Sequence, residues 1–405
     1  MNKQANDTEN MKKLRVLMLA PQPWFQPRGT PFSVLHRIKA YSLLGHDVDL
    51  ATYHVGQDIP LEHLSIYRSM TIPFIKKVKV GPSKTKLFLD FFHIALTLKL
   101  LKNNKYDLIH THEEASFWGA FLARTLKIPH LYDMHSSLPQ QLINFKFTKY
   151  KPILKLFDNL EKYTIKNSQA VITICPELQH YVEQHFPGKK SILIENVADN
   201  SIIFKSDAGA EDRLRQKYGL DGKKIILYYG TFEPYQGLDL LINSAKFVFN
   251  DSSQDIVFLL VGGNDKQQLQ YKEKAHQLDL ATHFVFTGFA QPEVIPAFVN
   301  MADVLVSPRL KGNNSPLKIY SYLRSGKPIV ATRHITHTQI LDDTVAVLTK
   351  PEPEDFAAGI ISVLAQKQRS EKLVRAAQKL AADKYSYDDY LQKTRKALEM
   401  VLGVN

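Results

Sequence analysis

Short apolar runs alternate along the chain with longer segments in which apolar residues recur every three or four positions. The runs predict β-strands, and the recurrence predicts helices with one face on a core. In the first half, strands are expected at residues 14–20, 47–52, 106–110, 128–134, 170–174 and 191–196. In the second half, they are expected at residues 224–230, 256–262, 283–288, 303–307, 328–332 and 345–348. Strands separated by helices form parallel sheets that are covered on both faces.

The repetition of this pattern predicts an α/β protein with two Rossmann-like domains. The first is expected over residues 14–200 and the second over 201–386, with the boundary in the polar stretch 199–213. A last helix at 387–403 is expected to pack back on the first domain, and residues 1–13 are expected to be disordered. Ligand sites are expected at the carboxyl ends of the strands, in a cleft that both domains face.

The segment GNNSPLKIYSYLRSGKPIVAT, residues 312–332, places a polar run directly before a predicted helix. Ser315 suits the N-cap, Pro316 the first helical position, and Gly326 the left-handed end of the helix. A helix N-terminus that follows a strand favours an anion such as a phosphate. Helix capping alone would also explain the Ser-Pro pair.

Two further strand-end loops carry residues suited to a phosphorylated ligand. After the first strand, Gly29 would let the backbone approach a ligand and Arg28 would supply charge, although a plain turn explains the same residues. In the second half, Gly230 and Gly237 enclose a loop ahead of a helix. Near the polar run at 312–316 stand three cations: Arg309, Lys311 and Lys318. Several such loops directed at one cleft indicate a phosphorylated ligand.

Histidines follow two strands of the first half. His110 and His112, with Glu113 and Glu114, are compatible with a metal site. Residues two apart on a strand also share one face without any metal, and we expect no metal here. His135 follows the fourth strand, where an imidazole can orient a substrate hydroxyl; a structural histidine is the alternative.

Composition narrows the class of protein. With 405 residues, 44% of them hydrophobic and 23% charged, the chain fits an ordinary globular protein of two domains. The single cysteine, Cys175, cannot form an intrachain disulfide, which favours a reducing compartment. The N-terminal residues lack the apolar region of a signal peptide, and no apolar run is long enough to span a membrane. We therefore expect a cytoplasmic protein.

The net charge of +12 is concentrated in the first 200 residues. Lysines interleaved with aromatic residues can hold a protein on an anionic membrane surface, here the inner face of the plasma membrane, although a solvated basic face is the alternative. Nucleic acid is not expected, because no recognition-helix, RNP or zinc pattern is present. The two basic clusters are Lys76, Lys77, Lys79, Lys84 and Lys86, and Lys146, Lys149, Lys151 and Lys155.

From about residue 14 to 400, the chain resembles bacterial glycosyltransferases of family 4, which have the two-domain GT-B fold. The resemblance is carried by RVLMLAPQP with PRGTPFSVL, LLGHDVDLAT, YDLIHTH, GTFEPYQGLDLLI and SPLKIYSYLRSGKPIVAT, in this order and spacing. It implies transfer of a sugar from a nucleotide-sugar, most often a UDP-sugar, with retention of anomeric configuration and without a metal or other cofactor. The donor would bind mainly to the second domain and the acceptor to the first.

The chain departs from the family at four positions. The usual Glu-x7-Glu pair falls at Asn313 and Ser321, and the usual Arg and Lys of the glycine loop fall at Thr231 and Gln236. In the family, the first carboxylate meets the donor sugar and the second grips the ribose. Asn313 can still hydrogen-bond a sugar hydroxyl, whereas Ser321 is too short to imitate a carboxylate.

The resemblance implies a retaining glycosyltransferase that extends a lipid-linked or cell-envelope glycan or an exopolysaccharide. His135 and Asn313 are its expected catalytic residues. The expected donor and phosphate contacts are Arg28, Gly29, Thr30, Gly230, Thr231, Gln236, Arg309, Lys311, Asn314, Ser315, Pro316, Leu317, Lys318 and Ser321. A catalytically silent nucleotide-sugar-binding or scaffold subunit is the main alternative, and a sugar-nucleotide epimerase on the same fold is a third.

Overall fold

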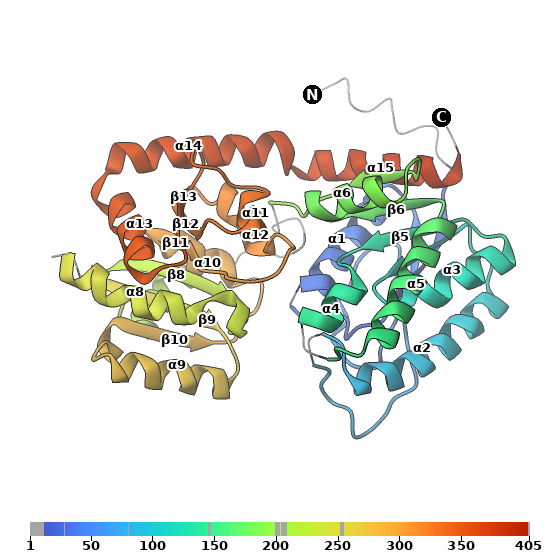
Figure 1. Cartoon of the computed structure of the whole chain (residues 1–405), viewed down its shortest axis with the longest axis horizontal. Helices are drawn as coiled ribbons and strands as arrows, with labels where there is room; N and C mark the ends of the chain where they lie inside the picture. The colour runs from blue at the N-terminus through green and yellow to red at the C-terminus, as the bar shows by residue number, and fades with distance from the viewer. Residues whose placement is uncertain are drawn as a thin grey trace. The chain divides into compact units, whose positions relative to one another are not determined.

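The computed structural model describes residues 12–27, 29–79, 81–144, 147–198, 203, 209–251 and 255–403. Internal contacts divide the chain into two compact units (Figure 1). The first unit comprises Met1–Glu195 and Asp388–Asn405, and the second comprises Asn196–Tyr387. The expected disordered segment 1–13 lies outside the described residues except for its last two positions.

The first unit contains a seven-stranded parallel sheet in the order β3-β2-β1-β4-β5-β6-β7. Its strands are β1 (Arg15–Ala20), β2 (Asp47–Thr52), β3 (Leu64–Arg68), β4 (Leu108–His112), β5 (His130–Met134), β6 (Ala170–Thr173) and β7 (Ser191–Leu193). Its helices are α1 (Gly29–Leu43), α2 (Lys84–Asn103), α3 (Ala115–Leu126), α4 (Leu138–Asn144), α5 (Lys151–Asn167), α6 (Pro176–His185) and α15 (Tyr387–Leu402), the last beginning at the unit boundary.

The second unit contains a six-stranded parallel sheet in the order β10-β9-β8-β11-β12-β13. Its strands are β8 (Lys224–Gly230), β9 (Ile256–Gly262), β10 (Phe284–Gly288), β11 (Val304–Ser307), β12 (Ile329–Thr332) and β13 (Val347–Thr349). Its longer helices are α7 (Ala210–Tyr218), α8 (Leu238–Asp251), α9 (Asp265–Gln277), α13 (Pro353–Ala365) and α14 (Lys367–Lys384). Its short helices are η1 (Pro234–Gln236), η2 (Ala281–His283), α10 (Ile295–Met301), α11 (Leu317–Arg324) and α12 (Ile335–Thr338).

Continuous apolar strands explain why both sheets are buried on two faces. Along β8, the run Ile225–Tyr228 is fully buried, and its alternate side chains enter two separate cores. Leu17 and Leu19 of β1 likewise belong to a core under the first sheet. A parallel sheet covered on both sides requires strands of this composition.

The order of strands places one topological switch point in each unit. Chain connections leave β1 toward β2 on one side and return to β4 on the other; in the second unit, β8 and β11 have the same relationship. Open α/β sheets bind ligands outside the carboxyl ends of the strands at such points. The loops after β1, β4, β8 and β11 are therefore the first places to look for a site.

All twelve strands expected from the sequence are present, with ends that differ by a few residues. The expectation missed β3, an edge strand whose side chains are only half-buried or exposed, so that it lacks the apolar run of the others. Helix α11 begins at Leu317, with Pro316 as the N-cap, so the expected assignment of Ser315 as N-cap and Pro316 as first helical residue was wrong by one position. The physical reason is that Pro316 has an extended ψ of 131°.

Candidate functional site

The ends of β8 and β11, and the loops that follow these two strands, lie at the switch point of the second unit. Gly230 ends β8, Ser307 ends the adjacent β11, and α11 follows the loop after β11. Gly237, at the start of the helix after β8, has a φ of +78°, and a Cβ there would lie 1.8 Å from the carbonyl oxygen of Pro308. Only glycine allows this close approach, which holds the loop after β8 against the loop after β11.

Lys318, in the first turn of α11, is the central cation of this region. Its side chain is 8% exposed, and its Nζ has no hydrogen-bond partner within the described part of the chain. The Nζ lies 3.7 Å from the centre of the Tyr228 ring and would lie 3.2 Å from a Cβ at Gly230. Burial lowers the pKa of Lys318 well below its ordinary value, and the positive charge of Arg309 lowers that pKa further. The geometry leaves a buried ammonium group that an anion would stabilise.

The start of α11 offers a second unpartnered polar group. Ser315 is 8% exposed, and its Oγ finds no hydrogen-bond partner among the described residues. The N-cap residue, Pro316, makes no side-chain hydrogen bond to the helix, so no side chain caps the first amides of α11. In proteins, hydroxyl groups, helix N-termini and ammonium groups all bind phosphates. The start of α11 brings one of each.

Arg309 and Lys311 differ in their surroundings. The guanidinium of Arg309 lies 5.2 Å from the centre of the Tyr235 ring, and its Nε donates to the carbonyl oxygen of Lys311 at 2.9 Å. Lys311 itself is exposed. Arg309 therefore belongs with Lys318 in this region, whereas no residue of the described chain pairs with the ammonium of Lys311.

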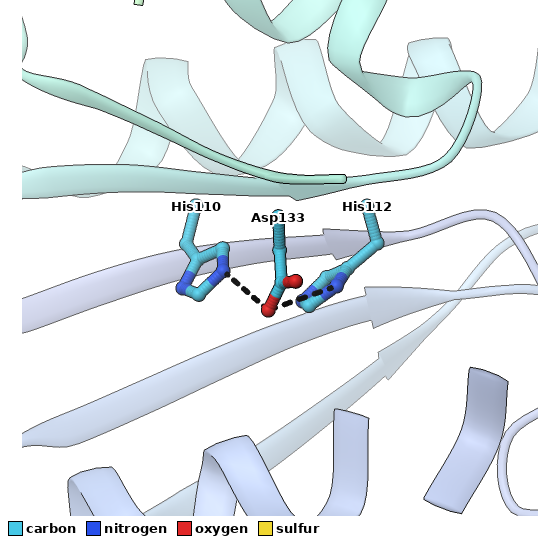
Figure 2. A group of neighbouring side chains, drawn as sticks. All are labelled: His110, His112 and Asp133. Atoms are coloured by element: carbon cyan, nitrogen blue, oxygen red, sulfur yellow. Dashed lines mark ion pairs between the residues drawn. The ribbon is translucent and has the colours of Figure 1, made fainter. Parts of the chain in front are cut away.

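In the first unit, histidines from β4 surround a buried carboxylate on β5 (Figure 2). Oδ2 of Asp133 lies 3.5 Å from Nε2 of His110 and 3.9 Å from Nδ1 of His112. The two imidazoles stack with ring centres 4.7 Å apart. His112 Nδ1 and His135 Nε2 are 2.9 Å apart, so the cluster extends to the histidine that the sequence singled out.

A guanidinium neutralises this carboxylate. Arg37, on α1, donates from Nε to Oδ2 of Asp133 at 3.0 Å, and both residues are buried. Burial alone would raise the pKa of Asp133, but Arg37 and the histidines hold that pKa well below its ordinary value. Arg37 also donates to Thr394 at 3.1 Å and lies over the Tyr390 ring at 5.0 Å, which joins α15 to the first unit.

His110, His112 and Asp133 could in principle hold a metal ion, since one ligand atom from each lies within 4.8 Å of the others. However, Arg37 already pairs with the carboxylate oxygen nearest to both histidines. Burial lowers the pKa values of His110 and His112, so both rings are neutral at pH 7. A neutral histidine pair around an Arg–Asp ion pair accounts for the arrangement without a metal.

The carboxyl end of β4 carries a second buried charge cluster. Lys86 Nζ lies 3.1 Å from Glu113 and 2.6 Å from Glu114, and Thr30 Oγ1 donates to Glu113 at 2.8 Å. Although burial opposes the charge, the two carboxylates raise the pKa of Lys86. The expectation that Lys86 belongs to an exposed basic cluster was therefore wrong: its ammonium group is paired in the interior. The sequence contains these charged residues, but it could not show that Lys86 pairs with Glu113, which lies 27 positions away.

The sequence also predicted ligand contacts at Gly29 and Arg28, on the α1 side. A Cβ at Gly29 would meet no atom within 4 Å, so the fold itself does not require glycine there. Arg28 lies outside the described residues.

Two known protein families match the chain. Residues 27–201 match the family described as Glycosyltransferase Family 4, and residues 210–380 match glycosyl transferases group 1. The chain is a GT-B glycosyltransferase of the family 4 type.

The relatives of this glycosyltransferase span most of its length. It is 24% identical to an uncharacterized glycosyltransferase of Methanocaldococcus jannaschii over 375 residues, 88% of this chain and 91% of that protein. It is 23% identical to the phosphatidyl-myo-inositol mannosyltransferase of Mycobacterium tuberculosis over 402 residues, 96% and 98% of the two chains. The structure of Anabaena HepE in complex with UDP-glucose superposes with a TM-score of 0.73 at 16% identity, covering 95% of this chain and 99% of that one.

In this glycosyltransferase, neutral contacts occupy the positions for which the family resemblance implied charged residues. Gln236 lies with its Nε2 3.5 Å from Thr231 Oγ1, and the Tyr228 hydroxyl donates to the carbonyl oxygen of Thr231 at 2.7 Å. Ser321 hydrogen-bonds with the side chain of Tyr229, whose pKa burial raises to about 12. The backbone oxygen of Asn313 accepts from Gln339 at 2.6 Å, which holds the loop before α11. Asn314 and Leu317 complete this loop and the helix start.

Proposed function

We propose that this glycosyltransferase transfers a hexose, with retention of configuration, from a nucleotide-sugar whose diphosphate binds at the N-terminus of α11. The observation that carries the proposal concerns Lys318 and Ser315 at the start of α11. Both are buried, and neither the ammonium nor the hydroxyl has a hydrogen-bond partner among the described residues. A UDP-sugar is the proposed donor, because HepE, which has the same fold, was crystallised with UDP-glucose.

The chemistry asks the protein for positioning and for charge stabilisation. In retaining transfer of this family type, the leaving phosphate takes the acceptor proton, so that no protein nucleophile is needed. The amides at Ser315–Leu317, the ammonium of Lys318 and the guanidinium of Arg309 would stabilise the departing diphosphate. Asn313 would hydrogen-bond the donor sugar and His135 would orient a sugar hydroxyl. These protein groups would replace a metal ion in neutralising the phosphates.

The proposed acceptor is a glycan or a lipid-linked glycan of the cell envelope or of an exopolysaccharide, met at the cytoplasmic face of the membrane. Support comes from the similarity to a mannosyltransferase that is named for the lipid phosphatidyl-myo-inositol. No helix among the described residues has the length and hydrophobicity that crossing a bilayer requires. We propose that the protein attaches peripherally to the membrane surface.

Turnover of nucleotide-sugars tests this function. Purified protein without added metal is incubated with UDP-, GDP- and ADP-hexoses, and release of the nucleoside diphosphate is measured with and without lipid extracts as acceptor. We expect release with one nucleotide class, strengthened by acceptor, and its loss in Lys318→Met but not in the control Lys372→Met, at an exposed position of α14 outside the proposed site. No release with any donor and any acceptor would contradict the proposed enzyme.

A silent nucleotide-sugar-binding or scaffold subunit is the second candidate. It is favoured by the neutral Thr231–Gln236 and Ser321–Tyr229 contacts, which stand where the family has charged groups. Nucleotide binding without turnover over a broad acceptor panel would support it, and any donor hydrolysis that depends on Lys318 would exclude it.

A further inference from the structure

Helix α2 (Lys84–Asn103) buries several polar side chains and exposes large apolar ones, unlike an ordinary surface helix. Its inward side carries Asp90, His93 and Thr97 as well as the apolar Leu89 and Leu100, and all five are buried. Asp90 accepts a hydrogen bond from the Tyr53 hydroxyl at 2.6 Å, and His93 Nε2 lies 2.9 Å from the carbonyl oxygen of Ala51. A helix of a globular protein normally turns such residues to water and its apolar stripe to the core.

The outward side of α2 is apolar instead. Phe91 is 68% exposed, and the other large apolar residues of this side are between 46% and 56% exposed. They are Leu87, Phe88 and Leu98. Spacings of three, four and seven along a helix place these four side chains on one face. Single exposed apolar residues are ordinary, whereas a continuous stripe marks a surface that binds something.

The exposed charged residues of α2 and of the described segment before it, 69–79, are all lysines. Lys84, Lys99 and Lys102 are exposed on α2, whose single acidic residue, Asp90, is buried. The segment before the helix adds exposed lysines and the aromatic ring of Phe74, which is 81% exposed. Its exposed lysines are Lys76, Lys77 and Lys79.

This segment is held against the helix. Ile72 and Val78 share a small core with Leu89 of α2, and Ile75 and Phe92 pack against that core. The basic loop and the apolar stripe therefore belong to one surface. We call the four apolar residues of α2, Phe74 and the six exposed lysines the α2 face. Figure 1 shows α2 on the outside of its unit.

We propose that the α2 face lies in the headgroup region of a bilayer rich in anionic lipid, with Phe74, Leu87, Phe88, Phe91 and Leu98 among the acyl chains and the lysines at the phosphates. Leucine and phenylalanine flanked by lysine alone match an interfacial helix, whose apolar side is buried at the boundary of headgroups and acyl chains. An acidic protein partner would also pair with the lysines and cover Phe88 and Phe91, but it would not make the chain float with lipid vesicles. The inference deepens the proposed function, on which it rests for a membrane-bound acceptor.

The test is flotation of the full chain with vesicles. Vesicles contain phosphatidylcholine alone or with about one third phosphatidylglycerol, at low and at high salt, and the matched variants are Leu87→Gln/Phe91→Gln on the face and Leu43→Gln/Leu269→Gln elsewhere. Leu43 and Leu269 are exposed to a similar extent, 48% and 58%. All variants are first checked for an unchanged melting temperature and nucleotide binding.

We expect the wild type and the Leu43/Leu269 control to float with anionic vesicles, and the Leu87/Phe91 variant to lose about tenfold or more in partitioning. A second readout is a blue shift of tryptophan emission in Phe91→Trp on addition of anionic vesicles. Absence of wild-type flotation at low salt would overturn the proposal. Equal flotation of the Leu87/Phe91 variant would overturn it as well, since lysines alone would then suffice. A wild-type dimer that this variant converts to monomer would show that a second copy covers the face.

Failure of this inference is distinguishable from failure of the enzyme. The α2 face lies outside the donor site, so turnover with a detergent-dispersed or water-soluble acceptor is expected to stay unchanged in Leu87→Gln/Phe91→Gln. Flotation without any nucleotide-sugar turnover would support the membrane face and contradict the proposed function.

Discussion

The Nζ of Lys318 lies 3.7 Å from the centre of the Tyr228 ring, and within the described chain no carboxylate is paired with it. An aromatic face attracts a cation, but far less than the water that burial removes. A lysine that is costly to the unliganded fold is retained most simply when a ligand neutralises it.

Lys318→Met should therefore stabilise the protein in the absence of nucleotide. Methionine fills a similar volume and removes an uncompensated buried charge, so the free energy of unfolding should rise by about 1–3 kcal/mol. Chemical denaturation of Lys318→Met and of Lys311→Met checks this. A loss of stability in Lys318→Met, with no change in the control, would show that the ammonium has a structural partner.

The same lysine predicts the pH dependence of stability. Its folded-state pKa is lowered well below 10.5, so between that lowered pKa and 10.5 the unfolded chain binds more protons than the folded one. The contribution of Lys318 to the free energy of unfolding then rises with pH in this window, and Lys318→Met should remove that rise. Denaturation at several alkaline pH values compares the two proteins. Identical pH profiles would contradict the lowered pKa.

Asp90 predicts an opposite dependence. Burial, with help from Glu114, raises the pKa of Asp90 from 3.8 to about 8. The folded protein therefore keeps a proton that the unfolded chain loses, and stability declines as the pH rises from about 4 through 8. Asp90→Asn imitates the protonated acid and can still accept from Tyr53, so at pH 8 it should be at least as stable as wild type and show a flatter profile. The control Glu62→Gln, at an exposed position, should leave the profile unchanged; an Asp90→Asn profile as steep as that of wild type would contradict the raised pKa.

Breaking the Arg37–Asp133 pair should be costly. Asp133→Asn leaves a buried guanidinium without its counter-ion and should lower the free energy of unfolding by about 3–5 kcal/mol. Arg37→Met/Asp133→Asn removes both charges and should lose less than Asp133→Asn alone. A double-mutant cycle by urea denaturation measures the coupling. Strong destabilisation of the wild type by a chelator would instead indicate a metal at His110, His112 and Asp133.

His135→Ala should reduce turnover by about 100-fold while leaving nucleotide affinity unchanged, because the residue is proposed to orient a sugar hydroxyl and not to hold the diphosphate. The measurement is kcat and KM for the donor, with nucleotide affinity determined separately. Full turnover in His135→Ala would remove His135 from the catalytic residues.

Much of the fold could be predicted from the sequence, because parallel strands buried on both faces need continuous apolar runs such as the one in β8 (Lys224–Gly230). β3 (Leu64–Arg68) was missed because an edge strand buries too little to need one. The site was predictable in part. The Ser-Pro run indicated a helix N-terminus, but the isolation of Lys318 depends on which side chains surround it in space.

Two other features needed three-dimensional contacts. Lys86 counts as one more basic residue in the sequence, and only its approach to Glu113 and Glu114 shows that it is buried and paired. Helix α2 shows apolar residues on both sides in the sequence, which gives no strong periodicity. The structure decides which side is outside, and that side proved to be the one with Leu87 and Phe91.

A diphosphate site at the N-terminus of α11 is tested most directly by calorimetric titration of UDP, with GDP, ADP and CMP as alternatives, into the wild type, Lys318→Met and Lys372→Met without metal. We expect one nucleoside diphosphate to bind the wild type and Lys372→Met with similar affinity and to bind Lys318→Met about 10–100-fold more weakly, as expected for loss of a charge-assisted contact of about 1.5–3 kcal/mol. Equal affinity for the wild type and Lys318→Met, or no binding of any nucleotide to the wild type, would contradict a diphosphate site at the N-terminus of α11.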